Sequence, residues 1–189
     1  MGPDEVLQLL VDCGAVLRGH FLLTSGRHGD GFVQCSQVMQ YPHYAEVLGR
    51  ELARRIGFEA DLVVGPAMGG VILAHEVARA LGIRAMFTEK TSEGMKFRRG
   101  FALAPGSRVI VVEDVVTTGG SVRRTAEAVE ALGGRVVAIG AIVDRSEGEW
   151  LRSEPPVPKV ALTTVQLRSF QPEECPMCKM GQPLVKPKD

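Results

Sequence analysis

The sequence lacks a surplus of charge of either sign, and this absence limits the possible partners. Lysine and arginine together number 22, aspartate and glutamate also number 22, and the net charge is therefore zero. Proteins that coat nucleic acid or bind an anionic membrane usually carry a basic excess. We therefore expect no nucleic-acid partner and no membrane partner. Any phosphate binding must then depend on a local group of residues.

Long apolar runs and cysteines are also scarce. No apolar stretch approaches the roughly 18 residues of a membrane-spanning helix, and the first residues, Met1–Glu5, are acidic where a secretory signal would be basic. Four cysteines in 189 residues are too few for a disulfide-rich secreted scaffold. These absences predict a cytoplasmic protein with reduced thiols.

Short segments rich in valine and isoleucine alternate with helical patterns in the middle of the chain. Such segments suit strands that are buried on both faces, and the helices between them suit the crossovers of a parallel sheet. With 45% hydrophobic residues, residues 1–189 are expected to form a single α/β domain. The predicted strands are 61–64, 83–88, 108–112 and 135–143; the predicted helices are 4–13, 43–56, 71–81 and 122–132; a hairpin or loop is expected at 21–34.

The most informative run follows the predicted strand at 108–112. Two carboxylates, Glu113 and Asp114, precede Val115–Val116, and the small and hydroxylated residues Thr117–Ser121 then open a helix. Backbone N–H groups at such a turn bind phosphate, and glycines let the backbone curl around it. Carboxylates accept hydrogen bonds from vicinal sugar hydroxyls. The run therefore predicts a site for a ribose 5-phosphate, with a solvated helix cap as the structural alternative.

Two familiar phosphate motifs are excluded, because the run has neither the lysine of a P-loop nor the glycine spacing of a dinucleotide fingerprint. It resembles instead the phosphoribosyl pyrophosphate (PRPP) signature of the type I phosphoribosyltransferases. Within that superfamily the chain resembles the orotate phosphoribosyltransferases. The segment 20–28 resembles their base-binding segment, Gly65–Gly70 their pyrophosphate loop, and Asp144–Arg145 a late pair containing a base-contacting arginine.

The resemblance implies the type I phosphoribosyltransferase fold, which is a central, mostly parallel sheet flanked by helices. An N-terminal hood over the base site would comprise approximately residues 1–40 plus the C-terminal segment, around a core of approximately 41–168. The implied reaction transfers the 5-phosphoribosyl group from PRPP to N1 of orotate, and gives orotidine 5′-phosphate and pyrophosphate on the pyrimidine route to UMP. Mg²⁺ would be the cofactor, bound mainly through PRPP, with no protein ligand expected.

Two alternatives remain open at this stage. A purine phosphoribosyltransferase, acting on adenine or xanthine, would keep the site at 113–121 and use a different hood. A regulator with the same fold, which senses nucleotides and binds RNA, would be expected to carry a basic face. The neutral net charge and the intact acidic pair argue against the regulator.

The candidate residues fall into three groups, and Thr24 and Gly69 stand where many relatives have lysine. The catalytic candidates are Asp114, Glu113, Lys90 and Lys96. The candidates for PRPP binding are Glu113, Asp114, Val115, Val116, Thr117, Thr118, Gly119, Gly120 and Ser121, with Ala67, Met68, Gly69, Lys90, Lys96, Arg98 and Arg99. The candidates for orotate binding are Thr117, Arg145, Phe32, Val33 and Thr24.

The segment 90–100 is hydrophilic and contains four cations, and it is long for a loop in a compact domain. This favours a lid that neutralises the departing pyrophosphate and excludes water. The alternative is a solvated hairpin with ordinary surface charge. In relatives the lid reaches the site of the neighbouring subunit, so the resemblance implies a homodimer.

Cys175 and Cys178 have the spacing of half a zinc site. Cys13 and Cys35 do not form a second matching pair, and the four histidines show no metal-like spacing among themselves. Two reduced thiols in a C-terminal turn are the favoured interpretation, and a structural zinc site is the alternative.

Overall fold

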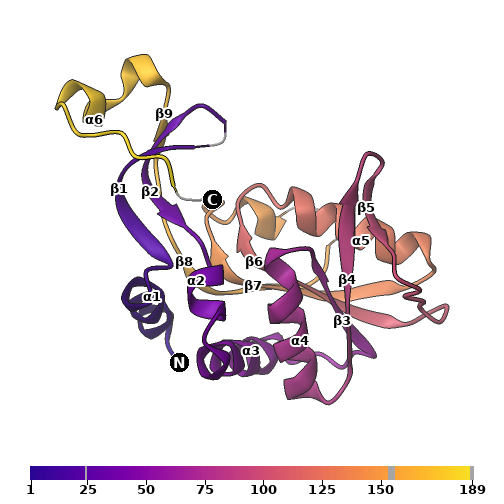
Figure 1. Ribbon diagram of the computed structural model, residues 1–189. Helices are drawn as coiled ribbons and strands as arrows, with labels where there is room; N and C mark the ends of the chain where they lie inside the picture. The colour runs from indigo at the N-terminus through magenta and orange to yellow at the C-terminus, as the bar shows by residue number, and fades with distance from the viewer. Residues whose placement is uncertain (24, 153–155, 188–189) are drawn as a thin grey trace.

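The computed structural model describes residues 1–23, 25–152 and 156–187, and the larger of its two sheets has six strands (Figure 1). The strand order is β5-β4-β3-β6-β7-β8, and only the β4–β5 pairing is antiparallel. The predicted α/β class with a mostly parallel central sheet is therefore confirmed. The strands are β3 (Leu62–Pro66), β4 (Arg84–Thr91), β5 (Gly94–Phe97), β6 (Arg108–Val116), β7 (Arg135–Asp144) and β8 (Lys159–Thr164).

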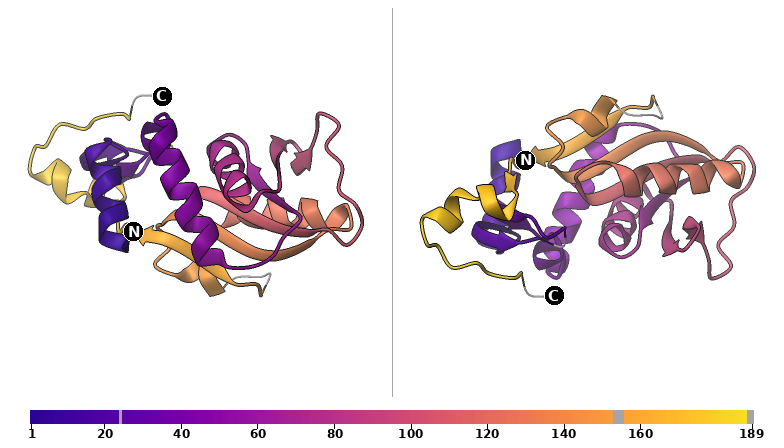
Figure 2. Two further views of the ribbon diagram at one scale, coloured as in Figure 1. Left: turned by 90° about the horizontal axis from the view of Figure 1, so that it is seen from below. Right: turned by 90° about the horizontal axis from the view of Figure 1, so that it is seen from above.

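Helices cover both faces of this sheet, as the two opposite views in Figure 2 show. Helices α3 (Pro42–Ile56) and α4 (Gly69–Leu81) lie on one face, and α5 (Gly120–Ala131) lies on the other. Because successive side chains of a strand point to opposite faces, Ile110 and Val112 of β6 pack in the core under α3 and α4, whereas Val109 and Val111 pack in the core under α5. Burial on both faces explains the unbroken valine and isoleucine run.

The smaller sheet joins the two ends of the chain. It follows α1 (Pro3–Asp12) and contains β1 (Val16–Leu22) and β2 (His28–Val33), and the short β9 (Ser169–Phe170) pairs with β2. Figure 1 shows this sheet to one side of the larger one, with the C-terminal segment running along it. The remaining short helices are α2 (Ser36–Met39), η1 (Glu149–Arg152), η2 (Pro172–Glu174) and α6 (Pro176–Lys179).

The secondary structure of the larger sheet differs from the expected one at three points. Strand β6 continues to Val116, so the acidic pair lies within the strand instead of after it. The chain after β7 returns as β8, which makes β8 the edge of the sheet. Segment 90–100 is largely a hairpin, because Thr91 accepts a hydrogen bond from the Glu93 N–H (3.2 Å) and donates one to the Gly94 carbonyl (3.0 Å), which closes a tight turn.

Among the described residues, no helix combines the length and the apolar character that crossing a membrane requires.

Candidate active site

The two predicted anion-binding turns meet at one point on the carboxyl edge of the larger sheet. Strand β3 leads into α4 on one face, whereas the neighbouring β6 leads into α5 on the other face. Ligands of open α/β sheets bind in the crevice where the chain direction switches in this way. The loop at 65–70 and the loop at 117–121 are therefore placed for one ligand.

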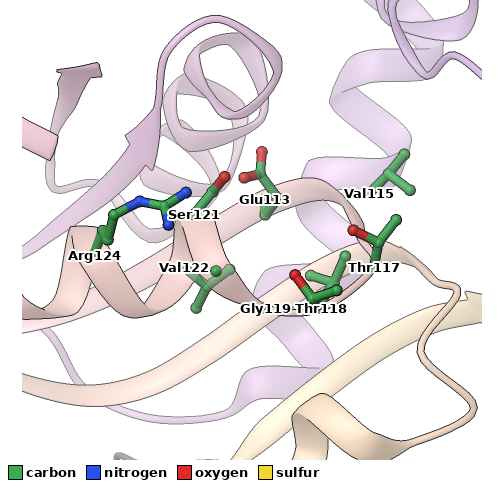
Figure 3. Close-up of a pocket in the computed structure, with 10 residues that line it drawn as sticks. Glu113, Val115, Thr117, Thr118, Gly119, Ser121, Val122 and Arg124 are labelled. Carbon is green, nitrogen blue, oxygen red and sulfur yellow. The ribbon is translucent and has the colours of Figure 1, made fainter. Parts of the chain in front are cut away.

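A cavity of about 130 Å³ opens at this point, formed by the end of β6, the following loop and the first turns of α5 (Figure 3). Pockets that hold a whole drug-sized ligand are larger, at roughly 300–1,000 Å³, so the cavity suits one part of a substrate, such as a phosphate group. Its lining comprises Glu113, Val115, Val116, Thr117, Thr118, Gly119, Gly120, Ser121, Val122 and Arg124.

The start of α5 makes this cavity favourable for an anion. Gly119 caps the helix in the left-handed conformation (φ 73°), and its carbonyl accepts the N–H of Arg123 at 2.9 Å. The N–H groups of the first helical turn have no partner within the helix and carry its positive dipole end. The predicted loop 117–121 therefore lies where a phosphate would be bound.

Arg124 is a site residue that the sequence reasoning missed. It lies one turn into α5, three residues after Ser121, and residues at that spacing share a helix face. In Figure 3 its side chain extends toward Ser121, which lies between Arg124 and Glu113 in that view. Its i+3 spacing from the last residue of the predicted run was the signal that could have identified it.

The acidic pair lies beside this cavity, in surroundings that disfavour the ionised form of both carboxyls. Glu113 is only 8% exposed, and burial together with the neighbouring Asp114 raises its pKa well above the usual range. Burial also raises the pKa of Asp114, although Asp114 accepts hydrogen bonds, including one from the N–H of Val115 at 2.8 Å. Two adjacent carboxyls with little solvent resist double ionisation. Hydrogen bonds donated by the hydroxyls of a bound sugar would stabilise the ionised form of the pair.

The loop at 65–70 packs directly against this pair. A Cβ on Gly69 would lie 2.7 Å from the Asp114 carboxyl carbon, and a Cβ on Gly65 would lie 2.6 Å from the carbonyl carbon of Gly70. Ala67 donates its N–H to the Thr88 carbonyl at 2.7 Å, and the Ala67–Met68 peptide is cis. The lysine that many relatives have at position 69 would therefore not fit while Asp114 keeps this position.

Gly69→Ala is expected to displace the Asp114 carboxylate and to weaken PRPP binding about 10-fold, which is the loss of roughly one charge-assisted hydrogen bond. The protein should remain folded, because the only close atoms are those of one short side chain. Titration calorimetry with PRPP and Mg²⁺ measures the affinity. Gly65→Ala is the contrasting variant, since its Cβ meets backbone atoms and should lower Tm instead. Unchanged affinity in Gly69→Ala would contradict the close approach.

On the base side, the structure brings Arg145 next to the phosphate loop. Val116 pairs with Asp144 across β6 and β7, and the Arg145 N–H donates to the Val116 carbonyl at 2.8 Å, directly before Thr117. Thr117 and Arg145 thus lie at the same sheet edge, as the sequence predicted.

The Arg145 guanidinium is prepared for a ligand. Its Nε is buried and finds no hydrogen-bond partner among the described residues. Burial lowers the pKa of Arg145, and the negative charge of Asp30 offsets part of that effect. The neighbouring Asp144 carboxylate is engaged elsewhere, because it accepts hydrogen bonds from the Ser146 N–H (2.8 Å) and hydroxyl (2.6 Å). A buried donor without a partner is costly, and a planar carboxylate would satisfy it.

Phe32 and Val33 lie at the end of β2, opposite Leu17 and Val16 of β1. Just beyond them the thiol of Cys35 donates to the Asp114 carbonyl at 3.8 Å, which places the end of β2 next to the acidic pair. Thr24, the remaining orotate candidate, lies outside the described residues.

The four cations predicted in the lid occupy two different environments. Lys96 forms an ion pair with Glu93, and Arg99 pairs with Glu89 at 2.7 Å. Lys90 and Arg98 are exposed, and the described residues give neither of them an ion pair.

Lys90 faces the phosphate side of the sheet. It follows Thr88 by two residues on β4, and the Thr88 hydroxyl lies 3.1 Å from the Thr125 hydroxyl of α5. Alternation along the strand therefore turns Lys90 toward the side of α5. A second cavity of about 440 Å³ separates α5 from the hairpin, and Arg124 lines both cavities.

Comparisons with known proteins define the class to which this site belongs. A model of the phosphoribosyl transferase domain matches residues 43–166. The matched span contains both predicted anion-binding loops, the acidic pair and Arg145, and the chain is therefore a member of the phosphoribosyltransferases.

Full-length relatives narrow the class. The orotate phosphoribosyltransferase of Caldanaerobacter subterraneus subsp. tengcongensis is 49% identical over 188 residues, which cover 99% of this chain and 97% of the relative. That of Pelotomaculum thermopropionicum is 51% identical over 191 residues, again covering 99% and 97%. The chain therefore belongs to the orotate phosphoribosyltransferase family.

Solved structures agree in fold. The orotate phosphoribosyltransferase of Aeropyrum pernix aligns with a TM-score of 0.69 at 28% identity, over 85% of this chain and 93% of that one. The Mycobacterium tuberculosis enzyme in complex with PRPP aligns with a TM-score of 0.69 at 24% identity, over 86% and 96%. The adenine phosphoribosyltransferase of Thermoanaerobacter pseudethanolicus shares the fold less closely, with a TM-score of 0.61 at 20% identity.

Proposed function

We propose that this chain transfers the 5-phosphoribosyl group of PRPP to N1 of orotate, and that it thereby produces orotidine 5′-phosphate and pyrophosphate for pyrimidine biosynthesis in the cytoplasm. The observation that carries the proposal is the Glu113–Asp114 pair, with Glu113 buried, beside an anion cavity at the start of α5. A diol reader next to a phosphate cradle is the arrangement that a ribose 5-phosphate requires.

The protein contributes positioning and charge, and needs no nucleophile. The loop 117–121 and Arg124 would bind the 5-phosphate, Glu113 and Asp114 would accept the ribose hydroxyls, and the loop 65–70 would bind pyrophosphate through its N–H groups. Substitution at C1′ passes through an oxocarbenium-like state, and nearby carboxylates favour developing positive charge. N1 of orotate can be deprotonated without a strong base.

Mg²⁺ fits this donor set. It prefers oxygen ligands and is commonly bound through substrate phosphates with one or two carboxylates. Glu113 and Asp114 border the two anion-binding turns, and Mg²⁺ would be bound mainly through PRPP. When bound, it would neutralise charge on the departing pyrophosphate.

The smaller sheet would form the hood over the base. The end of β2, with Phe32 and Val33, approaches the acidic pair through the Cys35 contact. Arg145 would then face the orotate carboxylate or a ring carbonyl with an unpaired buried donor. The buried, unpaired donor of Arg145 favours orotate over a purine base, because a purine base carries no carboxylate.

Loss of the near-ultraviolet absorbance of orotate in the presence of PRPP and Mg²⁺ tests the proposed reaction. We expect turnover that depends on all three components. Turnover of adenine or xanthine without loss of orotate would overturn the base assignment and leave the ribose-phosphate site in place.

We also propose that the β4–β5 hairpin is a lid that acts on the neighbouring subunit of a homodimer. Lys90→Ala should lower kcat about 100-fold, because an unpaired cation near the leaving group is lost. Lys96→Ala should lower it less, because Lys96 is already paired with Glu93. Steady-state kinetics under saturating PRPP and orotate measures both effects.

Mixing Lys90→Ala with Asp114→Asn tests the subunit arrangement. If the lid acts across the dimer, each mixed dimer has one site with neither substitution and recovers activity. If the lid acts within its own subunit, every site in the mixture keeps one substitution and activity stays low.

A further inference from the structure

Four side chains that the proposed reaction does not use converge outside the active site. His20 lies on β1, close to His28 at the start of β2. Cys175, just before α6, and Cys178, within α6, reach the two histidines from the C-terminal segment. One ligand atom from each residue lies within 4.8 Å of all the others. The sequence had offered only half a zinc site at the cysteine pair, because the histidines show no metal-like spacing among themselves.

Four of the six separations between the ligand atoms are close to the edges of a tetrahedron around one ion, and all six lie within 4.8 Å. With Zn–S of about 2.3 Å and Zn–N of about 2.05 Å, tetrahedral edges are roughly 3.3 Å for N–N, 3.6 Å for N–S and 3.8 Å for S–S. The His20 Nε2 atom lies 3.4 Å from Cys175 Sγ and 3.6 Å from Cys178 Sγ. The His28 Nδ1 atom lies 3.2 Å from Cys178 Sγ and 2.9 Å from His20 Nε2.

Hydrogen bonds alone do not account for this cluster. The His20 Nδ1 atom lies 2.9 Å from the Gln182 carbonyl, which accepts only, so Nδ1 carries the proton and Nε2 presents a single lone pair. Three groups, His28 Nδ1, Cys175 Sγ and Cys178 Sγ, approach that lone pair. One lone pair serves one good donor, whereas a central cation serves all four ligands.

The surroundings also suit a resident ion. His20, His28 and Cys175 are buried, and only Cys178 is exposed. The carbonyl of Gln182 orients His20, as carbonyls and carboxylates orient the histidine ligands of zinc sites. Among the described residues, this is the one group of three or more histidine, cysteine or acidic side chains that is arranged to hold a metal.

We propose that His20, His28, Cys175 and Cys178 bind a structural zinc ion. Two cysteines and two histidines form a complete tetrahedral set with no open position for a substrate, so the site is structural and not catalytic. The ion would fasten the β1–β2 hairpin to the C-terminal segment, next to the backbone bonds of Val185 with Leu22 (2.9 Å) and His20 (2.8 Å).

Metal analysis of untagged protein, purified without chelator or added zinc, tests the site directly. Inductively coupled plasma mass spectrometry across the first-row metals should find close to one zinc per chain. Cys178→Ser should lose zinc on dialysis against a chelator under conditions in which the unaltered protein retains it. Cys13→Ser is the matched control, because Cys13 lies outside the cluster, and it should keep its zinc.

Cobalt substitution reports the ligand set without relying on a variant. The Co²⁺ form should show the visible bands of tetrahedral cobalt and a thiolate charge-transfer band that weakens in Cys178→Ser. Removal of the metal should lower Tm by about 5 °C or more, because a bound ion stabilises only the folded chain.

The opposite results are equally clear. Protein that contains no stoichiometric metal, takes up neither zinc nor cobalt and has an unchanged Tm with chelator would overturn the proposal. A Cys175–Cys178 disulfide in freshly purified protein, or stoichiometric iron in place of zinc, would also overturn it. None of these outcomes depends on whether the chain turns over orotate.

Discussion

Asp114→Asn is expected to lower kcat/KM for PRPP about 100-fold while the fold remains intact. A hydrogen bond to a charged group contributes roughly 1.5–3 kcal/mol, and each 1.4 kcal/mol is about a factor of ten in rate. The side chain accepts the Val115 N–H in the free protein and would accept a ribose hydroxyl in the complex. Glu130→Gln, an exposed change near the end of α5, is the control and should keep full activity. A fully active Asp114→Asn enzyme would contradict the diol-binding role.

Glu113→Gln should also lose activity, but it should raise the stability of the ligand-free protein near pH 8. The pKa of Glu113 is raised in the folded state, so the folded chain holds the proton more tightly than the unfolded chain. Stability therefore falls as pH rises from the unfolded pKa, about 4.3, toward the raised folded pKa. Replacing the carboxyl by a neutral amide removes this loss. Scanning calorimetry of the ligand-free variant should show a higher Tm near pH 8 and no difference near pH 4.

The same raised pKa makes PRPP binding sensitive to pH. Ribose hydroxyls donate to the ionised carboxylates, so binding should release protons and strengthen as pH rises. Calorimetry in buffers of different ionisation enthalpy measures the released protons. Equal Tm for Glu113→Gln and the unaltered protein at pH 8, together with no proton release, would contradict the buried, proton-holding state of the pair.

Arg145→Ala is expected to raise KM for orotate about 100-fold and to leave the affinity for PRPP unchanged. The change removes a guanidinium whose buried Nε has no protein acceptor in the described part of the chain, and charged pairs with a carboxylate are among the stronger hydrogen bonds. Arg145→Lys should recover little, because an ammonium cannot reproduce the planar fork. Steady-state kinetics with varied orotate measures the effect.

The control for Arg145 lies on the same strand. Arg135 begins β7 at its opposite end and is exposed, so Arg135→Ala should behave as the unaltered enzyme. Comparing orotate with uracil, which lacks the carboxylate, identifies the group that Arg145 contacts. A preference for orotate that collapses in Arg145→Ala assigns the carboxylate, whereas a preserved preference assigns a ring carbonyl. An unchanged KM for orotate would remove Arg145 from the base pocket.

The sequence signals for the sugar side of the candidate site are local. A buried valine run, two carboxylates and a glycine turn before a helix all fall within eleven residues, from Val111 to Ser121. Local patterns also predicted α3, α4 and α5 to within a few residues. Arg124 was missed because it belongs to the helix after the motif, although its spacing from Ser121 was visible.

The features that sequence reasoning missed depend on contacts between distant segments. Strand β8 is stabilised by its pairing with β7 at the edge of the sheet. Its short segment, 159–164, mixes polar and apolar residues and gives little sign of a strand by itself. The fit of Gly69 against Asp114 joins the start of α4 to strand β6, some 45 residues further along the chain. The histidine and cysteine cluster joins residues from both ends of the chain, and spacing along the chain cannot reveal such a site.

The pairing of β9 with β2 has a consequence for how the protein is made. Synthesis delivers β1 and β2 first, and β9 among the last residues. A two-stranded hairpin alone is only marginally stable in water, so this part of the molecule waits, incomplete, while the central sheet forms from residues already released by the ribosome. We therefore expect the larger sheet, with the cavity at the start of α5, to form before the smaller sheet is complete, and a chain that stops short of residue 169 lacks the strand that pairs with β2.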